Sequence, residues 1–292
     1  MTLIAGVKVG NAGCIIGDFR LTNMNTGDQF DVAQKFIFLD NRLALYMAGS
    51  INTLGELKVI LAQKMSNISH QDVDNEDGFL YKTLKEYYDQ QDHNTQSIII
   101  GVHLDIDSGT NKMFRMDALS DGQRRTYKIV PDTEFECEVI GSGVIITDPN
   151  RFQNRPLYPL SYVFKKSIDK GYNVRTATDA VEHEILKRLK ELGPSIYQDA
   201  GITSVMNLTI IVGSALRVEG RTVEEFTVNQ NGEQIISSFT YEKVQNTEVV
   251  LKDNITSETV NVYQSDEDFP YDKLENEKIF DPQKIERRVK RP

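Results

Sequence analysis

Hydrophobic residues open the chain in the pattern of short paired strands. Two pairs of apolar runs each surround a compact segment rich in turn-forming residues. The runs are Leu3–Val9 with Cys14–Gly17, and Phe36–Leu39 with Leu43–Met47. We therefore expect two β-hairpins, with turns at 10–13 and 40–42.

From Ile51 the hydrophobic period becomes that of a helix, because apolar residues recur every three or four positions. Similar stretches predict helices at 79–89, 157–170 and 176–192, and the last carries an apolar stripe. Further strands are expected at 97–104, 112–118, 135–141 and 205–212.

The order of these elements favours an α+β fold. Four strands, two helices, three strands, two helices and a strand form separate blocks, which disfavours a doubly wound parallel sheet. We expect a four-layer αββα sandwich, in which two antiparallel sheets lie between two layers of helices.

The character of the chain changes after Ser214. Short strand-like runs separated by polar turns predict a β-rich extension, and the residues after it are rich in charge. The runs are 225–228, 234–241, 248–252 and 259–263. We divide the chain into a core at 2–213, a β-rich C-terminal extension at 214–263 and an extended or partly disordered tail at 264–292.

The net charge of the chain indicates which macromolecules it is not expected to bind. The formal net charge of −10 argues against a general nucleic-acid or anionic-membrane surface. No stretch approaches the roughly 18 apolar residues of a membrane span, and the first residues lack the pattern of a secretory signal. We expect a cytoplasmic protein that binds neither nucleic acid nor membrane.

Cysteine and histidine suggest no metal or cofactor. Cys14 and Cys137 each lie in an apolar run, so we interpret them as buried reduced thiols. The histidines lack metal-ligand spacing. They are His70, His93, His103 and His183.

Thr2 is the first candidate for chemistry. If Met1 is removed, one residue carries both a hydroxyl and a free α-amine, and the amine, with a pKa near 8, can accept the proton of the hydroxyl. By itself a threonine at position 2 is more often the ordinary start of a strand.

Four sequence segments between residues 2 and 50 bear on the role of Thr2. In order and spacing they resemble the proteasome β/HslV family of N-terminal nucleophile hydrolases. They read Thr2-Leu-Ile-Ala-Gly-Val-Lys-Val, Gly17-Asp18-Phe19-Arg20-Leu21-Thr22, Gln34-Lys35-Phe36-Ile37-Phe38 and Leu45-Tyr46-Met47-Ala48-Gly49-Ser50. Ile140-Gly141-Ser142-Gly143 resembles a later turn of the family, and the resemblance covers about residues 2–213.

The resemblance implies roles for the residues in these segments. Thr2 would be the nucleophile and its α-amine the base, while Lys35 would lower the pKa of the hydroxyl and Asp18 would hold the lysine. Gly49 would present its backbone N–H to the oxyanion of the tetrahedral intermediate. The structural alternatives are a Lys35–Asp18 ion pair without catalytic use and a turn at Gly49 that only begins a helix.

Ser142 and Asp199 resemble the residues that orient Thr2. The family usually has a serine three residues after this aspartate, but this chain has Ile202 there. Either Ser204 takes that role after a local shift, or the contact is missing. A homologue without activity therefore stays open as an alternative.

The substrate implied by the resemblance is an extended polypeptide. Thr22 and the strand end at Gly49 would pair with it by strand addition, and Arg20 would support the Asp18 loop beside it. Met47 would form the floor of an apolar specificity pocket. Its neighbours would be Leu21, Ala33 and Ile51.

Three functions follow from these patterns. The first is a threonine endopeptidase, processed at its N-terminus, in a self-compartmentalising homo-oligomer of one or more rings, served by an unfoldase or other activator. The second is a non-catalytic, proteasome-like scaffold subunit. The third is a small-molecule amidohydrolase with the same type of nucleophile.

Overall fold

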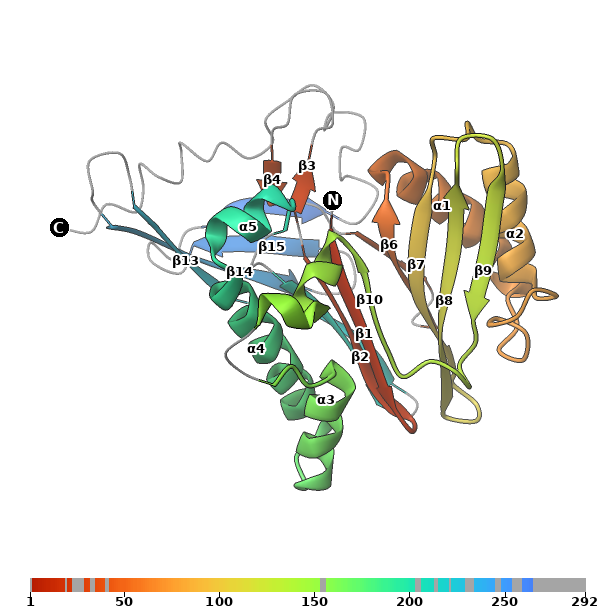
Figure 1. Ribbon diagram of the computed structural model, residues 1–292. Helices are drawn as coiled ribbons and strands as arrows, with labels where there is room; N and C mark the ends of the chain where they lie inside the picture. Colours follow the sequence, from red (N-terminus) through yellow and green to blue (C-terminus); the bar gives the residue numbers. More distant parts are fainter. Residues whose placement is uncertain are drawn as a thin grey trace.

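Two five-stranded antiparallel sheets form the centre of the computed structural model (Figure 1). Helices flank them, so the chain is a mixed α/β protein built on antiparallel sheets. The structure describes residues 2–18, 20–22, 29–31, 35–39, 42–152, 156–202, 206–212, 215–220, 222–228, 234–244, 248–253 and 259–264.

The first sheet has the strand order β10-β1-β2-β11-β12. Its strands are β10 (Cys137–Gly141), β1 (Leu3–Val9), β2 (Ala12–Asp18), β11 (Met206–Val212) and β12 (Ala215–Gly220). The expected first hairpin is present, with Ile4 opposite Gly17. On its other side β1 pairs with β10, and Leu3 lies opposite Gly141. The beginning of β1 is thus flanked by the end of β2 and the end of β10.

The second sheet follows the chain order from β5 to β9. Its strands are β5 (Phe36–Leu39), β6 (Leu43–Gly49), β7 (Ser97–Asp105), β8 (Thr110–Ser120) and β9 (Arg125–Val130). The sequence pattern did not predict β9, which lies at the edge of the sheet. Its exposed and half-buried residues alternate, and only its last residue is buried, so it carries little of the apolar signal that marks a strand.

Four of the helices in the described ranges match expected ones. They are α1 (Ile51–Lys64), α2 (Phe79–Asp89), α3 (Leu160–Asp169) and α4 (Val174–Leu192). The start expected for α3 at Leu157 was wrong, because Pro159 disfavours helical backbone before it and is the N-cap. The start expected for α4 was two residues late, because the Asn173 side chain accepts a hydrogen bond from the Thr176 N–H at 2.9 Å and caps the helix earlier.

Further short helices complete this part of the chain. They are the 3₁₀ turns η1 (Met65–Asn67), η2 (Ser142–Thr147) and η3 (Pro149–Arg151), and the α-helix α5 (Pro194–Asp199). The sequence pattern did not predict α5, since six residues are too few to show a helical period.

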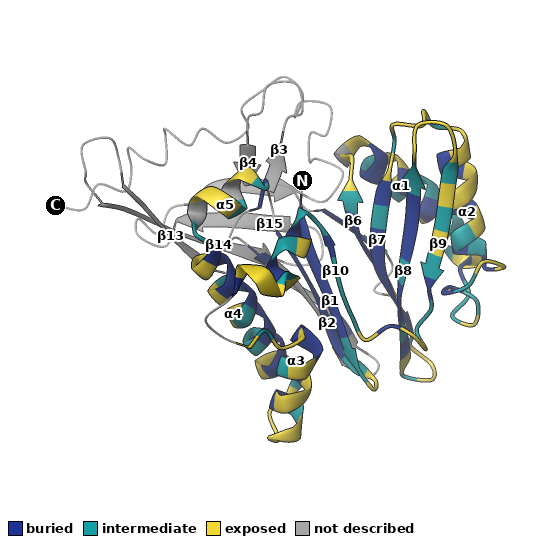
Figure 2. Ribbon diagram, in the orientation of Figure 1, coloured by how far each residue is buried: buried dark blue, intermediate teal, exposed yellow. Residues whose placement is uncertain are grey.

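Three hydrophobic clusters connect the sheets and helices. One lies between the first sheet and α3 and α4, and a second lies between the second sheet and α1 and α2. The third contains residues from both sheets, among them Ile4 and Ile15 from the first and Tyr46 and Ile100 from the second. Figure 2 shows β1 and β2 of the first sheet and β6, β7 and β8 of the second mostly in the colour of buried residues.

Both faces of the central strands are therefore buried. In β1, Leu3, Ala5 and Val7 face the helices, whereas Ile4 faces the other sheet. In β6, the side chains likewise alternate between the cluster under α1 and the cluster between the sheets. Burial on both faces explains why these strands read as nearly continuous apolar runs and not as strict alternation.

The later strands form a separate antiparallel sheet of the order β13-β14-β15-β16. They are β13 (Thr222–Val228), β14 (Gln234–Val244), β15 (Glu248–Asp253) and β16 (Thr259–Gln264). Strand β12 belongs to the first sheet, so that sheet continues past residue 213, where the sequence analysis divides the chain. The tail expected at 264–292 lies outside the described residues except for Gln264.

Both cysteines are free. Cys14 is buried among the residues that face α4, and burial raises its thiol pKa to about 12. Cys137 is half-buried, and burial raises its pKa as well. Both thiols therefore stay protonated and unreactive near neutral pH.

A pair of histidines joins the second sheet to the segment before α2. The Nδ1 atoms of His70 and His103 lie 3.0 Å apart, and His103, on β7, is only 4% exposed. Burial, followed by the nearby His70 and Arg42, lowers the pKa of His103 from 6.5 to about 4. The pair is therefore held together with His103 neutral.

We expect this pair to make stability fall in acid. As the pH falls, His103 takes up a proton near pH 6.5 in the unfolded chain but only near pH 4 in the folded one. The stability that depends on neutral His103 is therefore complete above about pH 6.5. It is lost as the pH falls toward 4, by at most about 3 kcal/mol. His103→Asn should flatten the dependence of the free energy of unfolding on pH in this window, measured by urea denaturation. The exposed His93→Asn is the control, and equal slopes for His103→Asn and the unchanged protein would contradict the expectation.

Candidate active site around Thr2

Thr2 lies directly before β1 and is almost covered, with 4% of its surface exposed. Its backbone carbonyl accepts a hydrogen bond from the Gly143 N–H at 3.0 Å. The next residue, Leu3, is already paired within the first sheet. The backbone at Thr2 is therefore fixed from the side of β10 as well as by the strand that it begins.

Asp18 is the residue that meets Thr2 from the other side. It ends β2, and the antiparallel register with Ile4 opposite Gly17 brings its carboxylate next to the start of β1. The Asp18 Oδ1 atom accepts from the Thr2 hydroxyl at 2.8 Å and from the Leu3 N–H at 2.8 Å. Asp18 is 2% exposed.

Lys35 gives the third hydrogen bond to the same oxygen. Its Nζ atom lies 2.7 Å from Asp18 Oδ1, and its side chain is 6% exposed. Lys35 directly precedes β5, and its carbonyl accepts from the Met47 N–H at 2.9 Å, which ties it to β6. The ion pair thus joins the second sheet to the first, beneath Thr2.

The shared oxygen places a cation near the Thr2 hydroxyl. Since Thr2 Oγ1 and Lys35 Nζ bind the same atom, they are within two hydrogen-bond lengths of each other. In a site closed to water, a positive charge at this range stabilises an alkoxide and lowers the pKa of a hydroxyl. The Asp18 carboxylate lies closer to the hydroxyl and by itself opposes loss of this proton, and the charge of Lys35 offsets that effect.

A glycine-rich turn closes around Thr2. Gly141 has a φ of 72°, and a Cβ there would lie 2.4 Å from the Thr2 carbonyl oxygen. A Cβ at Gly143 would lie 2.6 Å from Leu3 Cγ. Ser142, between them, is half-buried and begins η2. Both glycines are required by close approach, and Gly141 also by its backbone conformation.

Arg188 of α4 fixes the residues that follow this turn. It is 1% exposed on α4, and its guanidinium donates to the Ile146 carbonyl in η2 at 3.2 Å and to the Tyr158 carbonyl at 2.6 Å. Glu184, one turn earlier on the same helix, accepts from Arg188 Nε at 2.9 Å. The buried charge is therefore paired, and it fixes η2 against α4.

Gly49 ends β6 at the same end of the sheets and pairs with Ser97 of β7. A Cβ at Gly49 would lie 2.9 Å from the Gln96 carbonyl oxygen, so a side chain would disturb this strand end. The Ser97 hydroxyl forms a short hydrogen bond with the Tyr88 hydroxyl of α2. Burial raises the pKa of Tyr88 to about 12, so it acts as a neutral group that supports the strand below Gly49.

Met47 is buried in the cluster under α1, and its sulfur lies 3.6 Å from the Tyr88 hydroxyl. Ile51 is the first residue of α1. Arg20, Leu21 and Thr22 form β3, which pairs with β4 (Gln29–Asp31). The structure describes the backbone alone for β3, and Ala33 lies outside the described residues.

The remaining residues of the expected site are not gathered at Thr2 by any described contact. Asp199 is the last residue of α5 and is exposed. Ser204 lies outside the described residues, so the alternative of a shifted serine stays untested. The contacts described at Thr2 thus involve Asp18 and Gly143, with Lys35 joined through Asp18.

Sequence reasoning missed Arg188 and the Tyr88–Ser97 pair. Arg188 did leave a signal, since it lies seven residues after Val181 in the apolar stripe of α4 and three after Ile185. An arginine in that stripe indicates a buried and paired charge. The Tyr88–Ser97 contact left no such signal, because it depends on how α2 lies against β7.

Comparisons with known proteins identified no family for this chain. A scan against protein-family models and a search of curated proteins found no match to this sequence. Among the described residues, no helix combines the length and the apolar composition needed to cross a membrane. The same residues contain no group of three or more His, Cys, Asp or Glu placed to hold a metal ion.

We expect Asp18 and Lys35 to be strongly coupled. Asp18→Asn leaves a buried ammonium without its carboxylate, and Lys35→Met leaves a buried carboxylate without its ammonium, so each should destabilise the fold by about 3 kcal/mol. The double variant should lose less than the sum of the two in urea denaturation. Lys85→Met removes an exposed ion pair with Asp89 and should cost less than about 1 kcal/mol. Additive losses at Asp18 and Lys35 would contradict the shared-oxygen geometry.

Arg188→Met should free η2 from α4. We expect a loss of about 3 kcal/mol in the free energy of unfolding, because Glu184 loses its ion pair with a buried guanidinium and two carbonyls lose donors. Hydrogen exchange should become faster in residues 142–147 than in β7. Lys187→Met, at an exposed position next to it, is the control and should change neither quantity.

Proposed function

We propose that this protein is a threonine-type peptidase in which Thr2, once the bond before it has been cleaved, is the nucleophile. One observation carries the proposal: a buried lysine and the Thr2 hydroxyl bind the same carboxylate oxygen of Asp18 at the start of the first sheet. A structural ion pair alone does not require a hydroxyl at this point. The resemblance of residues 2–50 to the proteasome β/HslV family supports the same assignment.

The chemistry follows from the groups at the strand start. Cleavage before Thr2 exposes an α-amine next to its hydroxyl, and the neutral amine accepts the hydroxyl proton as Oγ1 attacks the carbonyl carbon of the substrate. The ammonium of Lys35 stabilises the developing negative charge, and Asp18 keeps that ammonium in place. The proton then passes to the leaving amine, and water hydrolyses the resulting ester to free Thr2.

Two backbone features support the reacting atoms in this proposal. The Gly49 N–H is assigned to the oxyanion, at a strand end where a side chain has no room. Gly143 holds the Thr2 carbonyl, so Thr2 keeps its position when its amine becomes free. Ser142, Asp199 and Ser204 are assigned as residues that orient Thr2 or relay protons.

The substrate in the proposal is an extended polypeptide that adds as a strand beside Thr22 and Gly49. Its side chain before the cleaved bond enters a pocket over Met47, and Met47 belongs to an apolar cluster, which supports a preference for apolar residues. Leu21, Ala33 and Ile51 are assigned to the pocket walls, and Arg20 to support of the Asp18 loop.

The finer architecture belongs to the same proposal. The three hydrophobic clusters support a four-layer αββα sandwich, and the sheet β13–β16 supports a β-rich C-terminal extension. We further propose a cytoplasmic homo-oligomer in rings that hides the active sites and works with an unfoldase or other activator. The finding on membrane spans is compatible with this location and does not distinguish it from others.

A non-catalytic scaffold is the second candidate. The burial of Thr2, with 4% of its surface exposed, favours it, because a substrate must reach a nucleophile. The peptidase proposal requires that removal of the residues before Thr2 opens this surface. The state of the N-terminus therefore separates the two candidates.

We expect a peptide epoxyketone to label the protein at Thr2, because this reagent joins a hydroxyl and an α-amine of the same residue. Native protein should begin at Thr2 by intact mass, and labelling and hydrolysis of fluorogenic apolar peptides should both be detected. Thr2→Ala should reduce hydrolysis about 10³-fold or more. Thr126→Ala, an exposed threonine of β9, is the matched control and should react normally.

The outcomes divide the candidates. Retention of the residues before Thr2 in native material, without labelling, would exclude the peptidase and leave the scaffold. Hydrolysis of simple acyl amides in preference to peptides, again dependent on Thr2, would identify an amidohydrolase instead.

A further inference from the structure

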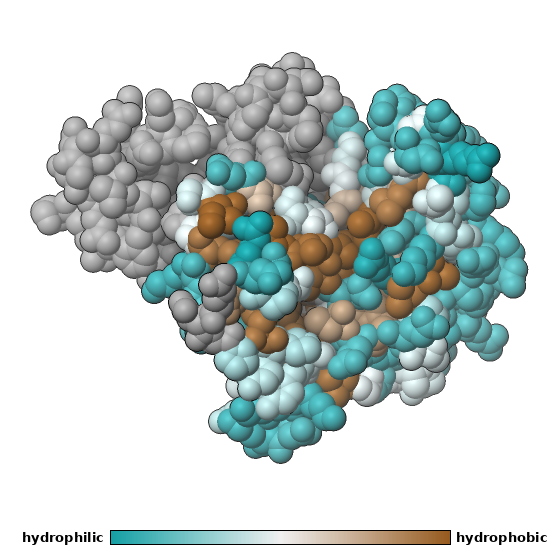
Figure 3. Space-filling model, viewed as in Figure 1, coloured by the Kyte–Doolittle hydropathy of each residue, from teal (hydrophilic) through white to brown (hydrophobic). Residues whose placement is uncertain are grey.

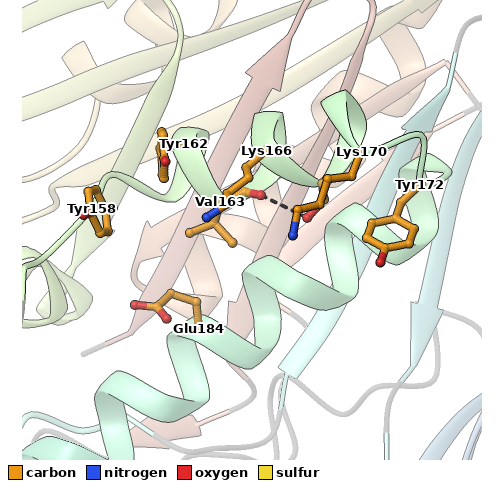
Figure 4. A pocket seen from close by; sticks show the side chains of 8 residues that line it. Tyr158, Tyr162, Val163, Lys166, Lys170, Tyr172 and Glu184 are labelled. Atoms are coloured by element: carbon orange, nitrogen blue, oxygen red, sulfur yellow. Dashed lines mark hydrogen bonds between the residues drawn. The ribbon is translucent and has the colours of Figure 1, made fainter.

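A groove lies along α3 where this helix meets α4 (Figure 4). Its volume is about 330 Å³. The lining comes from α3, from α4 and from the residues just before and after α3. It consists of Tyr158, Tyr162, Val163, Lys166, Ser167, Lys170, Tyr172 and Glu184. None of these residues belongs to the site around Thr2.

Tyrosine rings stand at both ends of the groove. Tyr158 and Tyr162 are stacked at one end, with ring centroids 4.9 Å apart, and Tyr172 stands at the other (Figure 4). Their exposed fractions are 51%, 44% and 53%. Each ring offers an apolar face with a polar hydroxyl at its tip, which suits contact with another aromatic or proline side chain.

Two lysines lie between the rings, Lys166 in the last turn of α3 and Lys170 at its C-cap. Lys166 Nζ is 5.7 Å from the centre of the Tyr162 ring, and Lys170 follows one turn later (Figure 4). Among the described residues, no carboxylate forms an ion pair with either lysine. The acidic residue across the groove, Glu184, binds Arg188 instead. The groove is therefore basic in a chain whose net charge is −10.

The groove is also preformed, because hydrogen bonds hold its walls. Arg188 binds both the Glu184 carboxylate and the Tyr158 carbonyl, so one buried side chain fixes the α4 wall and the start of the tyrosine stack. Ser167 is held by its own hydrogen bond to the Val163 carbonyl at 3.0 Å. A rigid surface loses little conformational entropy when a ligand binds. In Figure 3 the hydrophobic residues of this face gather in its middle, while the outer end of the α3 region is mostly polar.

These features define the chemistry of a ligand. Aromatic rings at both ends suit aromatic and proline side chains, and the two ammonium groups between them, which form no ion pair with a described residue, suit carboxylates. The groove follows the ten residues of α3, a length of about 15 Å. An extended segment of about five residues in polyproline conformation has the same length.

The chain itself contains such a segment directly after β16. Residues 265–272 read Ser-Asp-Glu-Asp-Phe-Pro-Tyr-Asp, with four acidic residues and no basic one. Phe269, Pro270 and Tyr271 lie together, and Asp268 and Asp272 flank them. Pro270 also favours extended backbone at Phe269. In charge and aromatic content this segment complements the groove, because the acidic residues 266–268 directly precede the aromatic ones.

We propose that the groove between α3 and α4 is the docking site for residues 266–272 of this chain. Phe269, Pro270 and Tyr271 pack on the tyrosines at one end of the groove, and the carboxylates at 266–268 that precede them pair with Lys166 and Lys170. The proposal is independent of the peptidase assignment, because it involves no residue of the Thr2 site. It gives the acidic segment a specific binding surface on the first sheet's helices.

The test places a photo-crosslinker in the full-length protein. Phe269→p-benzoylphenylalanine is irradiated, and the crosslinked peptides are identified by mass spectrometry. We expect crosslinks within residues 158–172. Lys166→Glu with Lys170→Glu should lower their yield roughly tenfold, since two favourable charge pairs become repulsive. Asp266→Lys with Asp268→Lys should restore the yield in the reversed background.

Lys165→Glu is the matched control, because Lys165 is exposed on the same helix and does not line the groove. It should leave the yield unchanged. A mixture of ¹⁵N-labelled and unlabelled protein shows whether the same chain or a second copy supplies the segment, and either result supports the proposal. Crosslinks that fall outside residues 158–172, or a yield unaffected by charge reversal, would overturn it.

Discussion

The structure depends on one carboxylate oxygen that three donors share. Asp18 Oδ1 receives the Thr2 hydroxyl, the Leu3 N–H and the Lys35 ammonium, each within 2.8 Å. A buried carboxylate is unfavourable unless donors replace the water that it loses, and here two donors come from the start of β1 and the third from Lys35 before β5. The same contact therefore joins the start of β1, the end of β2 and the segment before β5.

This constraint works because the central strands β1 and β6 are buried on both faces. The side chains between the sheets hold β1 and β6 at a fixed spacing, while the helices cover the outer faces. Lys35 is anchored to β6 through its carbonyl, so its position relative to Asp18 is set by how the two sheets pack. Rigid packing of this kind is what the proposed reaction at Thr2 needs, since small displacements of reacting groups are costly.

Helix α4 connects two otherwise separate features. On one side Arg188 fixes η2, the turn that leads from Gly143, and on the other its partner Glu184 forms a wall of the tyrosine-lined groove. The cationic character of that groove contrasts with the acidic chain as a whole. The contrast arises because Arg188 neutralises Glu184 and leaves Lys166 and Lys170 without a local counterion among the described residues.

The sequence by itself determined the main elements. Runs such as Leu3–Val9 and Leu43–Met47 predicted strands, and the helical period after Ile51 and at 176–192 predicted helices, because apolar spacing records which side chains are buried. It missed β9 and α5, whose residues bury too little surface or form too short a run to show a period. The motif around Thr2 also named Asp18 and Lys35 before any contact was known.

Only the tertiary structure decided how these residues meet. The convergence of Thr2, Asp18 and Lys35 on one oxygen depends on the antiparallel register of β1 with β2 and on the packing of the two sheets, and neither is encoded in local spacing. The same holds for Arg188 and for the tyrosine groove, whose parts come from separate elements. Local patterns report which side chains leave water, whereas a site requires knowing which of them become neighbours, and that is set by contacts between residues far apart in the chain.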